Sequence, residues 1–240
     1  EKDLIYDWNL IQHDFTRDEA SHPHPIWFDD ETLRDGLQSP SARNPRIEEK
    51  IELLDYMEIL GIQKVDLGLP GAGPLHIDHI DAMLAHISER SYEIRPGCAV
   101  RTVVSDIEPL VDLQAKHEMQ IQASAFLGTS PIRQYTENWT MDRIISTAEK
   151  AIGFAVDNDI PVMFVTEDTT RSKPEDIKAV YTRALELGAD RLCVCDLCAN
   201  RHSHAARHDA IRGDALPIQV ASRGRRVARD GDGDGALGAR

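Results

Sequence analysis

The stretch of this sequence that is best suited to chemistry is residues 28–40, where charged and amide side chains directly follow a short apolar run. The apolar run, residues 26–28, comes after a proline-rich, turn-forming segment, residues 21–25, and predicts the first strand of a core. In barrels of parallel strands, the reacting groups lie at the carboxyl ends of the strands. A strand that ends in a cluster of Asp, Glu, Arg and Gln therefore indicates a ligand site. A solvated loop of mixed charge is the alternative.

The same pattern recurs further along the chain, which favours the ligand site over the solvated loop. An apolar run at residues 62–69 contains Asp66, and a second run at residues 160–166 is followed by Glu167 and Asp168. Because the carboxyl ends of parallel strands meet at one edge of a sheet, these carboxylates are expected on the same side of the molecule.

Strands and helices alternate along the chain in the way needed to position these side chains. Short apolar runs predict strands, and apolar residues at helical spacing predict helices. The predicted strands are residues 26–28, 62–69, 98–104, 119–127, 160–166 and 191–195. The predicted helices are residues 44–60, 75–88, 106–117, 140–158 and 173–187. A doubly wound sheet and a (β/α)8 barrel both fit, although a barrel usually needs about 250 residues.

Composition limits the functions that the chain can have. The net charge of −14 argues against nucleic acid or an anionic membrane as a partner. No apolar run approaches the roughly 18 residues that cross a bilayer. The four cysteines do not form the pattern of a disulfide scaffold, so the expected location is a reducing cytoplasm.

The composition also changes along the chain and predicts three parts. Residues 1–25 are expected to form an extension packed on the outside, and residues 26–198 the catalytic barrel domain. Residues 199–240 contain no Lys, no Glu and no aromatic residue, and helical periodicity ends there. A natural disordered tail and a coding sequence read out of frame explain this composition equally well. The barrel is therefore expected to be incomplete, with about six strands.

Four motifs at the predicted strand ends carry a resemblance to a known superfamily. Residues 30–40 resemble D-x-T-L-R-D-G-x-Q-S-P, residues 65–70 resemble V-E-V-G-F-P, residues 126–132 resemble F-I-A-T-S-P-M, and residues 164–172 resemble F-S-P-E-D-A-T-R-S. These are signatures of the metal-dependent aldol and Claisen enzymes on TIM barrels. That superfamily includes isopropylmalate synthase, homocitrate synthase, citramalate synthase and hydroxymethylglutaryl-CoA lyase. The order and spacing of all four motifs agree.

The resemblance implies a Claisen condensation. Members remove a proton from the methyl group of acetyl-CoA and add the carbanion to a 2-keto acid, which a divalent metal (Mg²⁺, Mn²⁺ or Zn²⁺) holds and polarises. It implies that Asp35 is a metal ligand and that Arg34 stabilises the enolate oxygen. Gln38 would hydrogen-bond substrate or metal-bound water, and Glu167 would take part in proton transfer. The implied substrate contacts are Asp66, Thr129, Ser130, Arg133 and Asp196.

The sequence departs from the superfamily pattern at several positions. Asp66 stands where Glu is common, Arg133 where His is common, and Leu197 where Thr usually follows Asp196. The H-x-H-N-D motif, which supplies two metal-binding histidines, is absent. Asp230 and Asp232 lie in a similar pattern near the expected place and are weak candidates for metal ligands.

These observations predict a partial TIM barrel. The resemblance implies an acyltransferase of the isopropylmalate synthase kind, with leucine biosynthesis as the pathway. A homodimer is expected if the barrel closes. The motif at Glu167-Asp168 and the Ser39-Pro40 ending favour the synthases. Leu37, where the synthases usually have Glu, favours the lyase. A truncated or frameshifted copy without catalytic activity is the third alternative.

Overall fold

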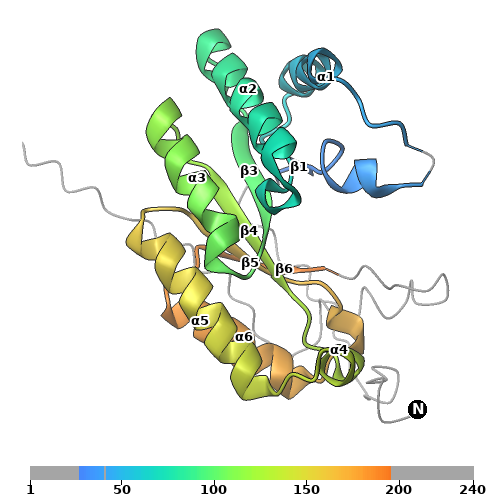
Figure 1. Ribbon diagram of the computed structural model, residues 1–240, viewed down its shortest axis with the longest axis vertical. Helices are drawn as coiled ribbons and strands as arrows, with labels where there is room; N and C mark the ends of the chain where they lie inside the picture. The colour runs from blue at the N-terminus through green and yellow to red at the C-terminus, as the bar shows by residue number, and fades with distance from the viewer. Residues whose placement is uncertain (1–26, 41, 196–240) are drawn as a thin grey trace, which may run out of the picture.

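The computed structural model describes residues 27–40 and 42–195, which form one parallel sheet with covering helices. The strands are β1 (Asp29–Asp30), β2 (Lys64–Asp66), β3 (Arg95–Arg101), β4 (Gln122–Leu127), β5 (Val162–Thr166) and β6 (Arg191–Val194). Each strand pairs in parallel with the next one along the chain. A doubly wound sheet reverses its strand order, so this order rules it out. The sheet curls into the half-barrel that the sequence predicts (Figure 1).

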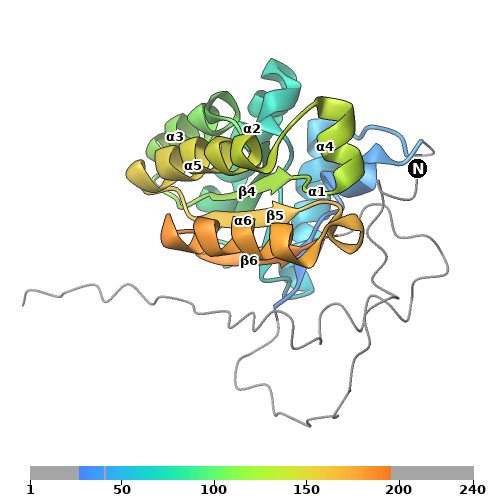
Figure 2. The same cartoon turned by 90° about the horizontal axis from the view of Figure 1, so that it is seen from below.

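The helices that accompany the sheet are α1 (Ile47–Ile59), α2 (Pro74–Arg90), α3 (Val104–His117), α4 (Pro131–Glu137), α5 (Met141–Asp157) and α6 (Pro174–Glu186). The longer helices lie along the outside of the curled sheet, where α1 contacts α2, α2 contacts α3, α3 contacts α5 and α5 contacts α6, and the short helix α4 lies at the carboxyl end of the strands (Figures 1 and 2). Short 3-10 turns follow three strands: η3 (Asp35–Gln38), η4 (Pro70–Ala72) and η5 (Thr169–Arg171). These turns place backbone and polar side chains at the carboxyl end of the sheet.

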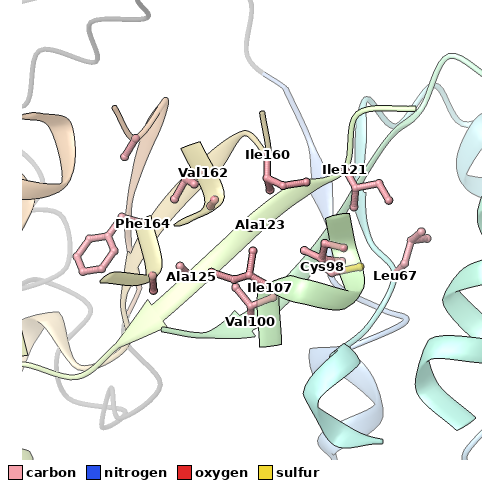
Figure 3. Close-up of a cluster of buried hydrophobic side chains, with 14 of the residues drawn as sticks. Leu67, Cys98, Val100, Ile107, Ile121, Ala123, Ala125, Ile160, Val162 and Phe164 are labelled. Carbon is pink, nitrogen blue, oxygen red and sulfur yellow. The ribbon is translucent and has the colours of Figure 1, made fainter. Parts of the chain in front are cut away.

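The core fills the space between the sheet and the helices (Figure 3). In α2, residues Ile80, Met83, Leu84 and Ile87 are buried, at the three- and four-residue spacing that puts them on one helix face. Phe164 of β5 is fully buried and meets the ring of Tyr181 from α6 edge to face, with ring centroids 6.2 Å apart. The apolar periodicity of the helices therefore determines which side of each one faces the sheet.

Two sequence predictions about local structure were wrong. The first strand is Asp29–Asp30 rather than residues 26–28, and Phe28 is 65% exposed. Asp29 and Asp30 pair with Lys64 and Val65 of β2, and the Phe28 carbonyl oxygen accepts a hydrogen bond from Lys64 N at 3.1 Å. The sequence analysis also missed α4, which begins after Ser130 because its hydroxyl accepts a hydrogen bond from Arg133 N and Pro131 occupies the first turn.

Some sequence predictions fall outside the described residues. They include the N-terminal extension, the segment 199–240, and the candidate site residues Asp196, Asp230 and Asp232. Within the described part of the chain, no helix is both long enough and apolar enough to cross a membrane.

Candidate active site

Arg34 lies at the carboxyl end of β1 and connects this end to β2. Its Nε donates to Asp66 Oδ2 at 3.3 Å, Nη1 to Asp35 Oδ1 at 3.1 Å and Nη2 to Glu31 Oε2 at 2.5 Å. The loop that carries it is closed locally, since Gly36 N donates to the Glu31 carbonyl oxygen at 3.0 Å. The buried side chain of Leu33 anchors the same loop in the core. The guanidinium is thus held at a fixed place on the carboxyl edge of the sheet.

Asp66 is the buried partner of Arg34. Its Oδ1 accepts hydrogen bonds from Gly68 N at 3.0 Å and Ala99 N at 3.2 Å, and the residue is 3% exposed. Burial raises the pKa of Asp66 to about 7, the charge of Glu31 adds to the rise, and Arg34 opposes it. Burial also raises the pKa of Glu31. Asp66 is therefore a buried carboxyl group that is suited to exchanging a proton near neutral pH.

A second cluster lies at the carboxyl ends of β4 and β5. Asp168 accepts hydrogen bonds from Thr129 N at 3.0 Å and Ser130 N at 3.2 Å, so it joins the ends of the two strands. Thr129 Oγ1 donates to Ser172 Oγ at 2.8 Å, and both hydroxyl-bearing residues are fully buried. In this structure the hydroxyls of Thr129 and Ser130 are engaged with the protein, and the substrate contacts expected of them stay a prediction.

Glu167 and Arg133 face a pocket of about 300 Å³ beside this second cluster. Arg133 Nη2 lies 3.3 Å from Glu167 Oε1. Burial raises the pKa of Glu167, while Arg133 lowers it. Gly128 makes this contact possible, because a Cβ there would lie 3.0 Å from both the Glu167 carboxylate and the Arg133 side chain. A partly buried carboxyl group beside an open pocket is suited to proton transfer.

The predicted metal ligands are not brought together within the described residues. Asp35, whose side chain is 41% exposed, pairs with Arg34, and Asp230 and Asp232 lie outside the described ranges. In residues 27–40 and 42–195, no group of three or more His, Cys, Asp or Glu side chains could hold a metal ion. The described residues by themselves therefore do not fit a metal centre. Gln38 ends η3 with an exposed side chain.

The organising role of Asp168 could not be predicted from the sequence. The available signal was its position directly after a predicted strand and next to Glu167, but its partners lie 38 and 39 residues earlier in the chain. Only the pairing of β4 with β5 brings these groups together.

Replacing Asp168 with alanine is expected to lower the free energy of unfolding by about 2 kcal/mol, because two buried N–H groups lose their acceptor. Asp168→Asn keeps one acceptor oxygen and is expected to lose about half of that. Urea unfolding of the three proteins measures the effect. An Asp168→Ala protein as stable as the parent would contradict this role.

The chain is similar to known proteins over most of its described length. The family model described as HMGL-like matches residues 24–200. A 2-isopropylmalate synthase of Solidesulfovibrio magneticus is 30% identical over 177 residues, which cover 73% of this chain and 33% of that protein. Homocitrate synthase AksA of Methanocaldococcus jannaschii is 29% identical over 188 residues, covering 74% and 42%. This chain thus spans about a third of the length of the isopropylmalate synthases that it matches.

The fold of the chain is also found in solved structures. The HMG-CoA lyase of Brucella melitensis superposes with a TM-score of 0.58 at 16% sequence identity, covering 78% of this chain and 67% of that one. All four strand-end motifs lie within the residues that the family model matches. Because that match covers well over half of the chain and the parallel half-barrel agrees with it, the chain belongs to the HMGL-like family.

Proposed function

We propose that this chain takes part in a Claisen condensation of acetyl-CoA with a 2-keto acid, of the kind that 2-isopropylmalate synthase performs. The observation that carries the proposal is the placement of Arg34 at the carboxyl end of β1, fixed by buried Asp66. The names of the relatives support it, since the curated proteins matched include 2-isopropylmalate synthases and homocitrate synthases.

The three carboxylates around Arg34 have unequal roles in the proposal. Asp66 is buried and holds the guanidinium in place, whereas the side chains of Glu31 and Asp35 are about 40% exposed (40% and 41%). A substrate oxygen can therefore replace an outer carboxylate on Arg34 while the inner one remains. In the reaction, a proton leaves the methyl group of the acetyl thioester, and negative charge develops on the thioester oxygen. A guanidinium already aimed at that oxygen stabilises this charge.

The acid and base of the proposed reaction come from carboxyl groups whose pKa is raised. Glu167 faces the pocket at the end of β5 and is the candidate for moving protons to and from the reacting carbons. The enolate carbon then attacks the keto carbon of the second substrate, and hydrolysis of the thioester releases CoA. We include Asp66, Thr129, Ser130, Arg133 and Asp196 in the proposal as substrate contacts and Asp35 as a metal ligand, on the resemblance alone.

Arg34→Lys is expected to slow CoA release about a hundredfold, because a point ammonium cannot replace a planar fork of donors. The assay incubates the protein with acetyl-CoA, a divalent metal and a panel of 2-keto acids, and measures the free thiol. Arg46→Lys is the matched control, since Arg46 is exposed at the start of α1. Unchanged release in the Arg34→Lys protein would remove Arg34 from the mechanism.

The lyase alternative rests on Leu37 in the first motif, and the same assay distinguishes it. A lyase would cleave hydroxymethylglutaryl-CoA and release no CoA that depends on a keto acid. If neither CoA release with any 2-keto acid nor cleavage of hydroxymethylglutaryl-CoA were observed, the result would favour the third alternative, a protein that binds without catalysis.

A further inference from the structure

The guanidinium of Arg133 lies between two carboxylates and is held tightly by neither. Its Nη2 lies 3.3 Å from Glu167 Oε1, and its Nε lies 3.8 Å from Glu137 Oε1. By contrast, Arg101 binds the Asp106 carboxylate through two side-chain donors, at 2.7 and 2.8 Å. The Arg133 side chain is also 48% exposed, so its ion pairs are weak and it can readily exchange one anionic partner for another.

The backbone is fixed on both sides of the contact between Arg133 and Glu167. Arg133 N donates to Ser130 Oγ at 3.3 Å at the start of α4, and Glu167 N donates to the Leu127 carbonyl oxygen at 3.4 Å at the end of β5. Gly128 leaves the space in which the two side chains meet, since a Cβ there would lie 3.0 Å from Arg133 Cγ and 3.0 Å from Glu167 Oε1. The contact can therefore open and close by side-chain rotation alone.

An anion can reach Arg133 from the pocket of about 300 Å³ that this contact borders. A water molecule takes about 30 Å³ in the liquid, so the pocket has room for a small organic acid. The lining carries the guanidinium groups of Arg133 and Arg171 and the carboxylates of Glu167 and Asp168. Asp168 already accepts hydrogen bonds from two backbone amides. Glu167 is therefore the carboxylate that competes with an entering anion for Arg133.

The charged groups around Glu167 act on it in opposite directions. Its side chain is 16% exposed, and burial raises its pKa. Arg133 of α4 lowers that pKa, whereas Asp168 and Glu137 raise it, and Arg171 of η5 lines the same pocket. When Arg133 turns away, burial and the two neighbouring carboxylates all favour a protonated Glu167.

We propose that Arg133 is a positioning residue that controls the charge of Glu167 according to whether a 2-keto acid occupies the pocket. The inference rests on the proposed condensation, in which Glu167 moves protons. In the empty pocket, the guanidinium stabilises the Glu167 carboxylate. When the carboxylate of a 2-keto acid binds the guanidinium, Glu167 loses its cation and gains affinity for a proton. Glu167 thus becomes a stronger base once the keto acid is bound, and the proton that it takes is the one leaving the acetyl methyl group.

Titration of the Glu167 carboxyl group by carbon NMR, with and without pyruvate at constant ionic strength, tests the proposal. The signal is assigned by its absence in Glu167→Gln. In the parent protein, pyruvate is expected to move the titration midpoint of Glu167 to higher pH. Arg133→Gln is expected to have the higher midpoint without pyruvate and to lose the response to pyruvate, because no cation is left to be taken from Glu167.

Three further variants separate the charge of Arg133 from a general effect on structure. Arg133→Lys keeps a cation and is expected to retain part of the response to pyruvate. Gly128→Ala closes the space between the two side chains and is expected to raise the midpoint in the parent but not in the Arg133→Gln background. Arg143→Gln is the matched control and is expected to change nothing, because Arg143 stacks on Trp139 and does not line this pocket. Circular dichroism verifies that each variant is folded.

Two results would overturn the proposal. A Glu167 midpoint in the parent that pyruvate leaves unchanged would show that the keto acid does not take Arg133 from Glu167. An equal response to pyruvate in Arg133→Gln and in the parent would show that another group senses the keto acid. The titration requires no turnover, so its outcome is distinct from that of the condensation assay. A protein that titrates as expected but releases no CoA would retain the control of Glu167 and contradict the condensation.

Discussion

Replacing Gly71 with alanine is expected to lower the free energy of unfolding by about 3 kcal/mol, which combines overpacking with the displacement of a buried carboxylate from its hydrogen bonds. Gly71 lies in the turn η4 that follows β2. A Cβ at this position would lie 2.4 to 2.5 Å from three atoms of the Asp106 carboxyl group. Real Cβ atoms do not approach other atoms so closely, so the carboxylate or the turn must move.

Asp106 cannot move away without losing its own partners. Its Oδ2 accepts from Arg101 Nε at 2.8 Å and from Arg101 N at 3.0 Å, and its Oδ1 accepts from Arg101 Nη2 at 2.7 Å. The residue is 1% exposed at the start of α3. Displacing it would leave a buried carboxylate with fewer hydrogen bonds, which is costly in a protein interior.

Gly153→Ala provides the matched control for this prediction. Gly153 lies inside α5, and a Cβ there would meet nothing within 4 Å. Alanine at such a site is expected to stabilise the protein by about 0.5–1 kcal/mol. Urea unfolding of both variants gives the comparison. If Gly71→Ala changed stability as little as Gly153→Ala, the packing of η4 against α3 would not be as described.

The sequence predicted the helices and the sheet class well, because amphipathic periodicity depends on local residues. The predicted helix at residues 173–187 is α6 (Pro174–Glu186), and that at residues 140–158 is α5 (Met141–Asp157). The first strand was misplaced because its extent depends on where β2 offers hydrogen bonds. The apolar residue Trp27 is 38% exposed and contacts arginines instead of the core.

The candidate site was predictable in its composition but not in its contacts. The sequence placed Arg34 and Glu167 at strand ends, and the structure has them there. The ion pair of Arg34 with Asp66 joins residues that are 32 positions apart in the sequence. Only the pairing of β1 with β2 brings these two side chains together. The contacts of Trp27 could not be predicted for the same reason, since Arg95 and Arg191, which both lie against its ring, are distant in sequence.

The stability of the protein is expected to fall between about pH 4 and pH 7 because of Asp66. Its pKa is about 7 in the folded protein, against an ordinary value of 3.8 for an aspartate in the unfolded chain. In that range the folded protein keeps the Asp66 proton while the unfolded chain releases it, so rising pH favours unfolding. The contribution is fully present below the unfolded pKa and is lost as pH rises through the folded pKa. The shift sets an upper limit of about 4 kcal/mol on it.

Comparing the parent protein with Asp66→Asn isolates this group. Asparagine carries no titrating proton, so the stability of the parent relative to this variant is expected to fall from pH 4 to pH 7 and then level off. Glu49→Gln is the control, because hydrogen bonds from Arg43 and Arg46 lower the pKa of Glu49 to about 2. Its effect is complete by about pH 6, so its difference from the parent stays constant above that value, where the contribution of Asp66 is still changing. If the difference in stability between the parent and Asp66→Asn also stayed constant from pH 4 to pH 7, Asp66 would be ionised in the folded protein over that whole range. The hydrogen bonds from Arg34 and from the amides of Gly68 and Ala99 would then outweigh the effect of burial on its pKa.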